Sequence, residues 1–271
     1  MDSGSKFREE VKANIAALGA DAQLKAMTLA WMARANTSRY TYNFSWLGRP
    51  IIQYPQDVVA LQEVIWSVRP DLIVETGIAH GGSLVFSASM LALLDYCDAL
   101  EKRETIDPRK PGRRVLGIDI DIRAHNRAAI EQHPMASRIE MIEGSSVDER
   151  TVSQVREKAS GHQRVLVCLD SNHTHEHVLL ELEAYAPLVS PGSYCVVFDT
   201  AIEDMPAGMY PGRDWGKGNS PRTAVAEYLR RLSAQGRRGA DGAALRFEAD
   251  GAIESKLLIS VAPDGYLKRV A

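Results

Sequence analysis

The stretch that decides the fold reads Leu72-Ile73-Val74-Glu75-Thr76-Gly77-Ile78-Ala79-His80-Gly81-Gly82-Ser83-Leu84. Its first residues form a short apolar run that predicts a buried strand, with Glu75 at the carboxyl end. Three glycines then turn the chain into an apolar, helix-forming run that extends to Leu94. A strand, a glycine turn and a helix in this order indicate the first unit of a nucleotide-binding α/β sheet. In such sheets, ligands bind outside the carboxyl ends of the strands.

The spacing of these glycines distinguishes two classes of ligand. A dinucleotide needs Gly-x-Gly-x-x-Gly so that its pyrophosphate can rest on a helix N-terminus, whereas Gly77 is followed by Gly81 and Gly82. The carboxylate of Glu75 would repel a diphosphate, but it suits a ligand with a cationic centre. The pattern therefore favours S-adenosylmethionine (SAM), which carries a sulfonium and ribose hydroxyls, over NAD.

Length and composition limit the remaining possibilities. A chain of 271 residues, 45% hydrophobic and 25% charged, is long enough for one large α/β domain with an appendage, or at most two domains. The net charge of -3 argues against a nucleic-acid-binding surface, which normally needs a clustered basic face. We therefore expect small-molecule ligands and no nucleic-acid partner.

Cysteine usage and hydropathy bear on the compartment. Cys97, Cys168 and Cys195 are widely spaced, and the last two lie in apolar runs, which predicts buried thiols in a reducing compartment. The N-terminus has no apolar signal region, and no apolar run is long enough to span a bilayer. We expect a cytoplasmic protein, and the sequence leaves both a monomer and a homo-oligomer open.

Apolar runs alternate with helical periodicities from residue 57 onward, and this predicts a doubly wound, mostly parallel sheet. The expected helices cover 57–68, with Asp57 as its cap, and then about 83–100, 124–132, 147–158, 176–185 and 222–234. The expected strands cover 72–76, 115–119, 139–142, 165–169 and 194–198, with two later candidates at 244–248 and 256–260.

The N-terminal part differs from this pattern. Residues 7–34 have helical spacing with a break near Gly19, and residues 40–50 are dense in aromatic side chains. The aromatic segment is either a hydrophobic plug packed on the domain or a lid over a pocket. We expect an N-terminal helical and lid segment over residues 1–56 and a SAM-binding domain over residues 57–271.

Polar residues close the next two expected strands. The second strand ends in Asp119 and Asp121, where a carboxylate can accept both hydroxyls of a ribose. The third strand leads into Glu143-Gly144-Ser145-Ser146, which is polar and small and suits the edge of an adenine ring. Each of these residues alone could merely cap the following helix, but together they indicate a cofactor site.

The fourth and fifth strands contribute residues that fit catalysis. Asp170 and Asp199 follow neighbouring strands, so both carboxylates can face one cavity and form a site for Mg²⁺ or a similar hard cation. Such a cation would lower the pKa of a coordinated substrate hydroxyl. His173 is then placed to act as a general base; a structural role in the turn is the alternative.

Other interpretations of this region remain open. His173, His175 and His177 could bind zinc, although their spacing suits a strand and a helix is expected there. Glu203 and Asp204 are either additional metal ligands or residues of a solvated loop.

The chain resembles the cephalosporin hydroxylase-like and rhamnosyl O-methyltransferase family, which is more distantly related to catechol O-methyltransferase. The resemblance extends from about Tyr40 to the C-terminus and includes the aromatic entry segment with Trp46 and Gly48. It rests further on these motifs: Val74-Glu75-Thr76-Gly77 with Gly81-Gly82-Ser83, Gly117-Ile118-Asp119, Glu143-Gly144-Ser145-Ser146, Leu169-Asp170-Ser171-Asn172-His173 with His177-Val178, and Gly218-Asn219-Ser220-Pro221.

The resemblance implies a seven-stranded methyltransferase sheet, SAM as cofactor, a divalent metal, and methyl transfer to a hydroxyl of a small molecule. The acceptor is often a sugar on a natural product or glycolipid. Phe198 stands where family members often carry an acidic residue. By position, the resemblance implies that SAM is faced by Glu75, Gly77, Ser83, Asp119 and Ser145, and that the metal is held by Asp170 and Asp199. From their places at the strand ends, we add Gly81, Gly82, Asp121, Ser146 and Asp170 to the expected cofactor set, and Thr200 and Asp204 to the expected metal set.

The sequence thus predicts a metal-assisted O-methyltransferase with Asp170 and His173 as catalytic residues. Two rivals remain. One is an oxidoreductase or a hydroxylase component, against which the missing dinucleotide fingerprint and the lack of a two-histidine, one-carboxylate iron motif count. The other is a non-catalytic accessory protein that kept the SAM fold, an interpretation that Phe198 keeps open. The aromatics of residues 40–46, together with Tyr210 and Trp215, are expected to line the acceptor pocket.

Overall fold

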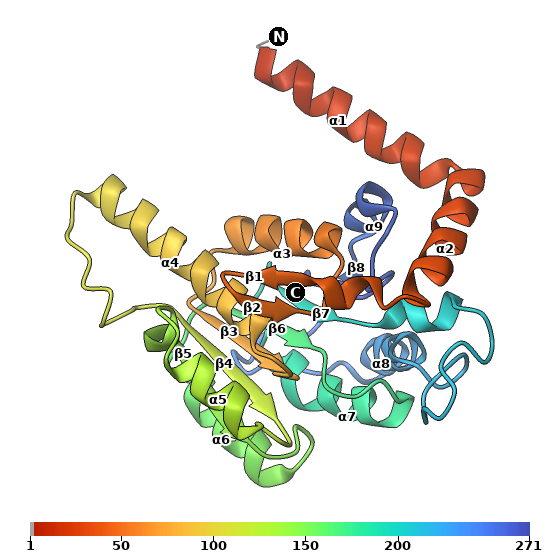
Figure 1. Cartoon of the computed structure of the whole chain (residues 1–271). Coiled ribbons are helices and arrows are strands. Elements are labelled where there is room, and N and C mark those ends of the chain that lie inside the picture. Colours follow the sequence, from red (N-terminus) through yellow and green to blue (C-terminus); the bar gives the residue numbers. More distant parts are fainter. Residues whose placement is uncertain (1–2) are drawn as a thin grey trace.

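The strands of the main sheet lie in the order β5-β4-β3-β6-β7-β9-β8 (Figure 1), in a computed structural model that describes residues 3–271. β3 to β7 run parallel, and β9 is antiparallel to both β7 and β8. Every residue of β3 and β6 is buried, as expected for central strands covered on both faces. The predicted doubly wound, seven-stranded sheet is confirmed.

The elements have the following bounds. The strands are β1 Phe44–Trp46, β2 Arg49–Ile51, β3 Leu72–Thr76, β4 Arg114–Asp119, β5 Ile139–Glu143, β6 Val165–Leu169, β7 Tyr194–Val197, β8 Phe247–Ala249 and β9 Tyr266–Arg269. The helices are α1 Ser3–Ala20, α2 Ala22–Asn36, α3 Pro55–Val68, α4 Gly82–Lys102, α5 Ala124–Glu131, α6 Glu149–Ala159, α7 His175–Tyr185, α8 Pro221–Gln235 and α9 Gly251–Leu257.

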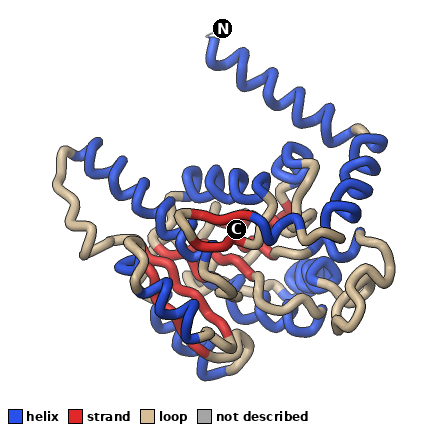
Figure 2. The backbone as a smooth tube through the Cα atoms, viewed as in Figure 1, coloured by secondary structure: helices blue, strands red, loops and turns tan. Residues whose placement is uncertain are grey.

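Helices cover both faces of the sheet (Figure 2). Because neighbouring residues of a strand point to opposite faces, Ile73 packs in a core with residues of α3 and α4, whereas Val74 packs in a second core with residues of α6, α7 and α8. The two apolar cores fix the strands relative to one another. The polar residues that follow the strands therefore lie together at one edge of the sheet.

The strand order reverses beside β3. The chain leaves β3 for β4 and β5 on one side, then crosses back so that β6 pairs with the other edge of β3. Loops on the two sides of such a reversal diverge and leave a crevice at the carboxyl ends of the strands. The fold therefore places a ligand site above β3 and β6.

The aromatic N-terminal segment is fixed to this part of the sheet. The β1–β2 hairpin packs on α4, where the Trp46 ring meets the Phe86 ring edge-on at 4.9 Å and its indole N–H donates to Ser89 Oγ at 3.0 Å. The Arg49 guanidinium donates to the carbonyl of His80 in the glycine turn. The hairpin is thus a packed element, as the plug interpretation predicted.

Two local predictions are wrong. Residues 256–260 form no strand, because the side chain of Asp250 accepts hydrogen bonds from the first amides of α9 and starts a helix there; the strand is β9 instead. Asp57 does not cap α3, which begins at Pro55 after Tyr54. The Asp57 carboxylate is buried and accepts hydrogen bonds from Ser260 Oγ, Val261 N and Tyr266 Oη.

One described helix, α4, is long and apolar enough to cross a membrane by length and composition, so the prediction that no apolar run reaches this length is wrong. Half of its apolar window is buried inside the structure. Leu84, Leu91 and Leu94 are almost fully covered in the same core as Ile73. Packing against the sheet therefore accounts for the apolar character of α4.

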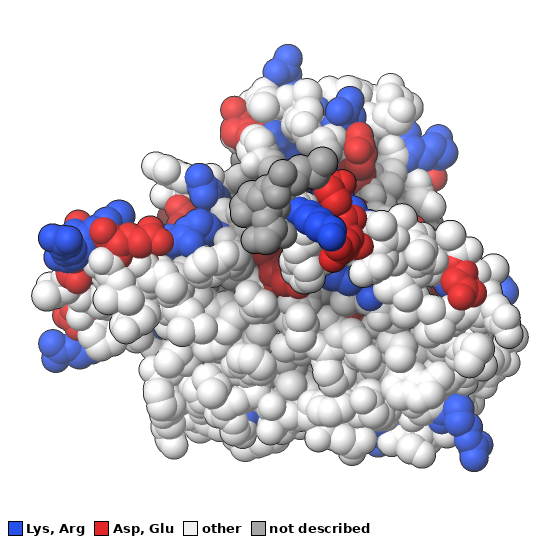
Figure 3. Space-filling model, turned by 90° about the horizontal axis from the view of Figure 1, so that it is seen from above, with Lys and Arg blue, Asp and Glu red and all other residues white. Residues whose placement is uncertain are grey.

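Acidic and basic side chains are mixed on the face seen from above, and a group of both signs lies at the far end of α4 (Figure 3). The loop that follows α4, between residues 103 and 113, carries an ion pair between the half-buried Asp107 and the exposed Arg109. In this view neither sign forms a continuous face.

We expect Asp57 to make stability depend on pH. Burial raises its pKa from 3.8 to about 6, so the folded state holds the proton more tightly than the unfolded state. The stability contributed by the protonated form is complete below about pH 4 and is lost as the pH rises through 6. Relative to Asp57→Asn, which does not titrate there, the wild type should lose up to about 3 kcal/mol between pH 4 and pH 7.

Urea unfolding of both proteins across this range measures the difference. A constant gap between the wild-type and Asp57→Asn free energies of unfolding would show that Asp57 keeps its ordinary pKa.

Candidate functional site

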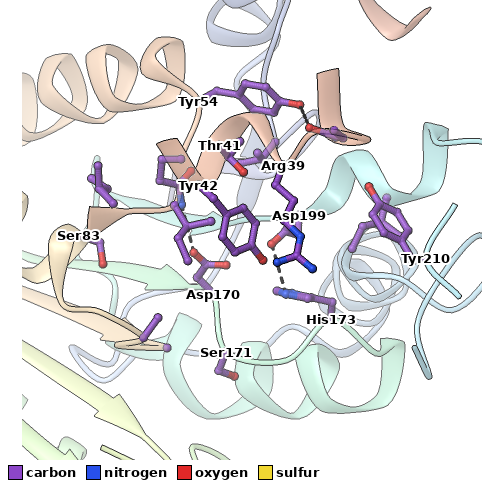
Figure 4. A pocket seen from close by; sticks show the side chains of 18 of the residues that line it. Arg39, Thr41, Tyr42, Tyr54, Ser83, Asp170, Ser171, His173, Asp199 and Tyr210 are labelled. Carbon is purple, nitrogen blue, oxygen red and sulfur yellow. Dashed lines mark hydrogen bonds and ion pairs between the residues drawn. The ribbon is translucent and has the colours of Figure 1, made fainter. Parts of the chain in front are cut away.

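A pocket of about 980 Å³ opens at the carboxyl ends of β3, β6 and β7. Three other segments complete its walls: the end of α2 with the turn that follows it, the chain from residue 50 to 54, and the loop from residue 209 to 215. Residues far apart in the sequence therefore meet at the crevice that the strand order predicted. The acidic side chains and His173 lie at its floor (Figure 4).

The predicted glycines allow the main chain to pack closely around this pocket. Gly77 has φ +90, and a Cβ there would lie 2.0 Å from the carbonyl oxygen of Asp170. A Cβ at Gly82 would lie 2.1 Å from the carbonyl oxygen of Pro50 in the hairpin. Gly81 has φ +81, and L-residues rarely adopt this left-handed conformation. Gly77 and Gly82 line the pocket, and their predicted contact with SAM stays a prediction.

Glu75 is 3% exposed and accepts a hydrogen bond from Ser83 Oγ. Burial raises the pKa of Glu75 to about 7, so a cation placed beside it would favour its charged form. Together with Ser83 and Asp170, Glu75 lines a small cavity behind the main pocket. Glu75, which is one of the residues predicted to face SAM, thus lies beside the glycine turn.

Asp119 shapes the glycine turn through its side chain. Its Oδ2 accepts hydrogen bonds from the amides of Ile78 and Ala79, at 2.8 and 3.2 Å, and its Oδ1 accepts one from the Asp121 amide. Asp121 itself is exposed. Neither carboxylate lines the main pocket. Their predicted contact with a ribose stays a prediction, whereas the support of the turn by Asp119 is observed.

The two serines after β5 differ from each other in their surroundings. Ser145 is half-buried, while Ser146 Oγ lies 3.0 Å from His177 Nε2 and 3.5 Å from Ser171 Oγ. Ser171 lines the pocket and donates to the buried carboxylate of Glu181 at 2.6 Å. A polar network therefore connects the end of β5 to the pocket wall, although Ser145 and Ser146 do not reach the pocket themselves.

Asp170, His173 and Asp199 converge at the pocket floor. One ligand atom of each lies within 4.8 Å of the others, an arrangement that suits a metal ion. His173 Nε2 is 3.4 Å from Asp199 Oδ2. Burial, with the negative charges of Asp199 and Glu75, raises the pKa of Asp170 well above its usual range. Such a pair of close carboxylates gains stability from a cation placed between them.

The backbone aims both carboxylates at this point. The Asp170 amide donates to the Thr76 carbonyl at 2.9 Å, which continues the pairing of β6 with β3. Asp199 has φ 58 and ψ 18 in the left-handed region, which is uncommon for a residue other than glycine and is enriched at functional sites. This turn directs Asp199 back over the end of β7.

The other residues that were predicted as metal ligands contact different partners. Thr200 Oγ1 donates to the carbonyl of Pro263 at 2.6 Å, and Asp204 forms an ion pair with Arg222. The structure does not bring either of them into the cluster with Asp170. Glu203 accepts hydrogen bonds from Gly218 N and Ser220 Oγ and thereby anchors the loop before α8.

The three histidines of the zinc alternative also contact different partners. His175 Nδ1 lies 2.8 Å from Thr223 Oγ1 on α8, and His177 joins the serine network described above. Only His173 of the three contributes to the described acidic cluster.

Sequence reasoning missed Gln53. Its side chain is 7% exposed, its amide nitrogen donates to Asp170 Oδ2 at 3.1 Å, and its carbonyl oxygen is buried without a hydrogen-bond partner among the described residues. Gln53 lies 117 positions from Asp170, and no local pattern signals such a contact.

Aromatic rings form much of the opposite wall. Trp215 meets the His173 ring edge-on at 5.2 Å and packs against Tyr210 at 4.7 Å. Tyr210 and Trp215 line the pocket, and of the aromatic residues expected between 40 and 46 only Tyr42 is among the described lining residues. Hence this segment serves as plug through Trp46 and as pocket wall through Tyr42.

The architecture and the site define a class of protein: an α/β fold like that of SAM methyltransferases, with an acidic cluster beside a glycine turn. The chain belongs to the rhamnosyl O-methyltransferase/CmcI family, whose profile matches residues 38–270. It is accordingly an enzyme of an O-methyltransferase family.

Individual relatives agree with this assignment. The chain is 28% identical over 214 residues to a rhamnosyl O-methyltransferase of Mycobacterium tuberculosis (strain ATCC 25618 / H37Rv), covering 79% of this chain and 73% of that protein. It is 26% identical to the corresponding enzyme of Mycobacterium leprae (strain TN), covering 83% and 82%. The Mg-SAM structure of CmcI matches with a TM-score of 0.52 at 18% identity, covering 85% of this chain and 78% of that one, and so supports the fold.

Substitution of Gly77 tests the close packing beneath the pocket. In Gly77→Ala the methyl group would collide with the Asp170 carbonyl and the positive φ would become strained, so we expect a loss of about 2 kcal/mol or more in the free energy of unfolding. Gly112→Ala is the matched control, because a Cβ there meets nothing within 4 Å. Urea unfolding of both variants checks this, and equal stabilities would contradict the role given to Gly77.

Proposed function

We propose that this protein transfers the methyl group of SAM to a hydroxyl of a small-molecule sugar, with help from a divalent cation held by Asp170 and Asp199. The observation that carries the proposal is the convergence of Asp170, His173 and Asp199 beside the glycine turn. The names of the relatives support a rhamnosyl acceptor, since these proteins are rhamnosyl O-methyltransferases.

The residues fit both groups. Two carboxylates whose oxygens lie close together are the donor set that Mg²⁺ prefers. The bare backbone at Gly77 and Gly82, with the buried carboxylate of Glu75 beside it, suits the amino-acid end of SAM. When bound, SAM supplies an electrophilic methyl group and the cation lowers the pKa of the acceptor hydroxyl.

The chain itself positions the acceptor and removes its proton. His173 Nε2 is placed to accept the proton of the acceptor hydroxyl as the hydroxyl oxygen takes up the methyl group that bound SAM would supply. Asp199, 3.4 Å from Nε2, stabilises the resulting imidazolium. Trp215 fixes the plane of the His173 ring by edge contact, and Gln53 holds the carboxylate of Asp170 in place. Positioning of this kind supplies much of the acceleration of a two-substrate reaction.

Binding measurements provide the first test. We expect S-adenosylhomocysteine to bind the purified protein with micromolar affinity by calorimetry, both with Mg²⁺ and with EDTA, because the proposed cofactor contacts come from the glycine turn. Absence of binding in both conditions would overturn the methyltransferase proposal. Binding of the cofactor product without any Mg²⁺ binding would instead favour the non-catalytic accessory alternative.

Substitutions separate the roles of the cluster. Asp170→Asn should weaken binding of Mn²⁺, followed by electron paramagnetic resonance, by at least about tenfold, because it removes a charged ligand. His173→Ala should lower kcat on rhamnosides by about 100-fold or more while leaving Mn²⁺ affinity unchanged. Asp107→Asn, in the exposed loop after α4, is the control for loss of one carboxylate. A parallel loss of Mn²⁺ affinity in His173→Ala would make His173 a ligand rather than the base.

A further inference from the structure

Two arginines line the pocket without a protein partner for their charge. Arg39 and Arg213 both belong to the pocket wall, and neither guanidinium forms a hydrogen bond or ion pair with any residue that the structure describes. Arg49, on the nearby hairpin, differs because the carbonyl of His80 and the side chain of Asn126 occupy its donors. The donors of Arg39 and Arg213 are therefore available to a ligand.

Each of the two guanidinium groups rests on an aromatic ring of the pocket. The Arg39 guanidinium lies 5.8 Å from the centre of the Tyr42 ring, and that of Arg213 lies 5.7 Å from the centre of the Trp215 ring. Contact with a ring face restrains a guanidinium while its N–H groups, which lie in its plane, stay free to donate. Trp215 also touches His173, so Arg213 is connected to the acidic cluster through a single side chain.

The backbone at Arg39 supports a role in binding. This residue has φ 50 and ψ 50, a left-handed conformation that is unfavourable for a residue with a side chain. In this conformation Arg39 points into the pocket, on the side where Asp199 and His173 lie (Figure 4). It comes from the turn after α2, whereas Arg213 comes from the loop between β7 and α8, so the two cations enter from separate wall segments.

Once a divalent cation is bound, the side chains that line the pocket leave an excess of positive charge. Among the described lining residues, the acidic side chains are Asp170 and Asp199. The proposed function assigns both of them to the divalent metal, which leaves the charges of Arg39 and Arg213 uncompensated. Guanidinium groups favour phosphate and carboxylate ligands through paired, charge-assisted hydrogen bonds.

We propose that the acceptor carries an anionic group, a phosphate or a carboxylate, which Arg39 and Arg213 bind while the reacting hydroxyl lies at His173. This inference rests on the proposed function and narrows its acceptor to anionic sugars. The carboxylate of the methionine end of SAM is the competing anion. The proposed cofactor contacts at Gly77 and Gly82 lie on a different wall segment from either arginine.

Matched acceptors test the proposal directly. 4-Carboxyphenyl rhamnoside and 4-nitrophenyl rhamnoside have nearly the same shape and differ in charge, and a nucleoside-diphosphate rhamnose adds the phosphate case. The variants are Arg39→Gln, Arg213→Gln and the double variant. Arg34→Gln is the control, because Arg34 is exposed on α2 outside the pocket. The readouts are kcat/KM with saturating SAM and Mg²⁺ and, separately, calorimetric affinity for S-adenosylhomocysteine.

We expect the wild type to prefer at least one charged acceptor over the neutral one. Each arginine variant should lose about tenfold or more in kcat/KM for that acceptor, with little change for the neutral rhamnoside and none in cofactor affinity. Raised salt should reduce the preference. The charged acceptor for which the arginine variants lose kcat/KM, the carboxylate or the diphosphate, identifies the anion that the site binds. The proposal would be overturned if the wild type used charged and neutral acceptors equally well. It would also be overturned if the arginine variants lost kcat/KM equally for both kinds of acceptor.

Cofactor binding separates this inference from the proposed function. A drop in S-adenosylhomocysteine affinity in the arginine variants would assign both residues to the cofactor carboxylate and overturn the acceptor assignment. If the wild type binds S-adenosylhomocysteine but methylates none of the rhamnosides, the rhamnosyl acceptor fails. The anion site is then tested by calorimetry with thymidine diphosphate, where binding lost in the double variant supports it and absence of binding to the wild type contradicts it.

Discussion

At Gly77 and Gly82 the main chain packs directly against other main-chain segments, with no side chain between them. A Cβ would lie 2.0 Å from the Asp170 carbonyl in the first case and 2.1 Å from the Pro50 carbonyl in the second. The first contact sets the end of β6 beside the glycine turn, and the second seats the N-terminal hairpin on the same turn. The floor and one wall of the pocket depend on these two approaches, since any larger residue would push the segments apart.

The acidic cluster shows how a fold maintains an unfavourable arrangement. Two carboxylates held close together repel one another, and burial adds to the cost of their charge, as the raised pKa of Asp170 indicates. The sheet fixes Asp170, a left-handed turn fixes Asp199, and Gln53 donates a hydrogen bond to Asp170 from the N-terminal segment. Such rigid placement is useful when a cation completes the site, because the chain then needs little rearrangement to bind it.

The motif Gly218-Asn219-Ser220-Pro221 has a structural explanation rather than a chemical one. Glu203 binds Gly218 and Ser220, and the Asn219 side chain accepts a hydrogen bond from the amide of His175. These contacts hold the base of the loop that carries Trp215. The motif therefore positions the pocket wall from a distance, and the aromatic side chains and Arg213 depend on it for their location.

The sequence by itself determined the parallel sheet, the glycine turn and the convergence of Asp170 with Asp199. Each of these follows from local patterns: apolar runs of strand length, glycines after a strand, and polar residues at strand ends that parallel pairing brings to one edge. Thr200 and Asp204 were grouped with that cluster because they are near Asp199 in sequence. The turn after β7 directs them to Pro263 and Arg222 instead.

Only the tertiary structure decided the other half of the site. Gln53 meets Asp170 across 117 positions, Arg39 and Arg213 line one pocket from opposite parts of the chain, and Asp57 binds the segment before β9 in place of capping its own helix. In each case the partners come from elements whose relative placement is set by packing of the two apolar cores. A local pattern contains no information about that packing, so these contacts could not be read from the sequence.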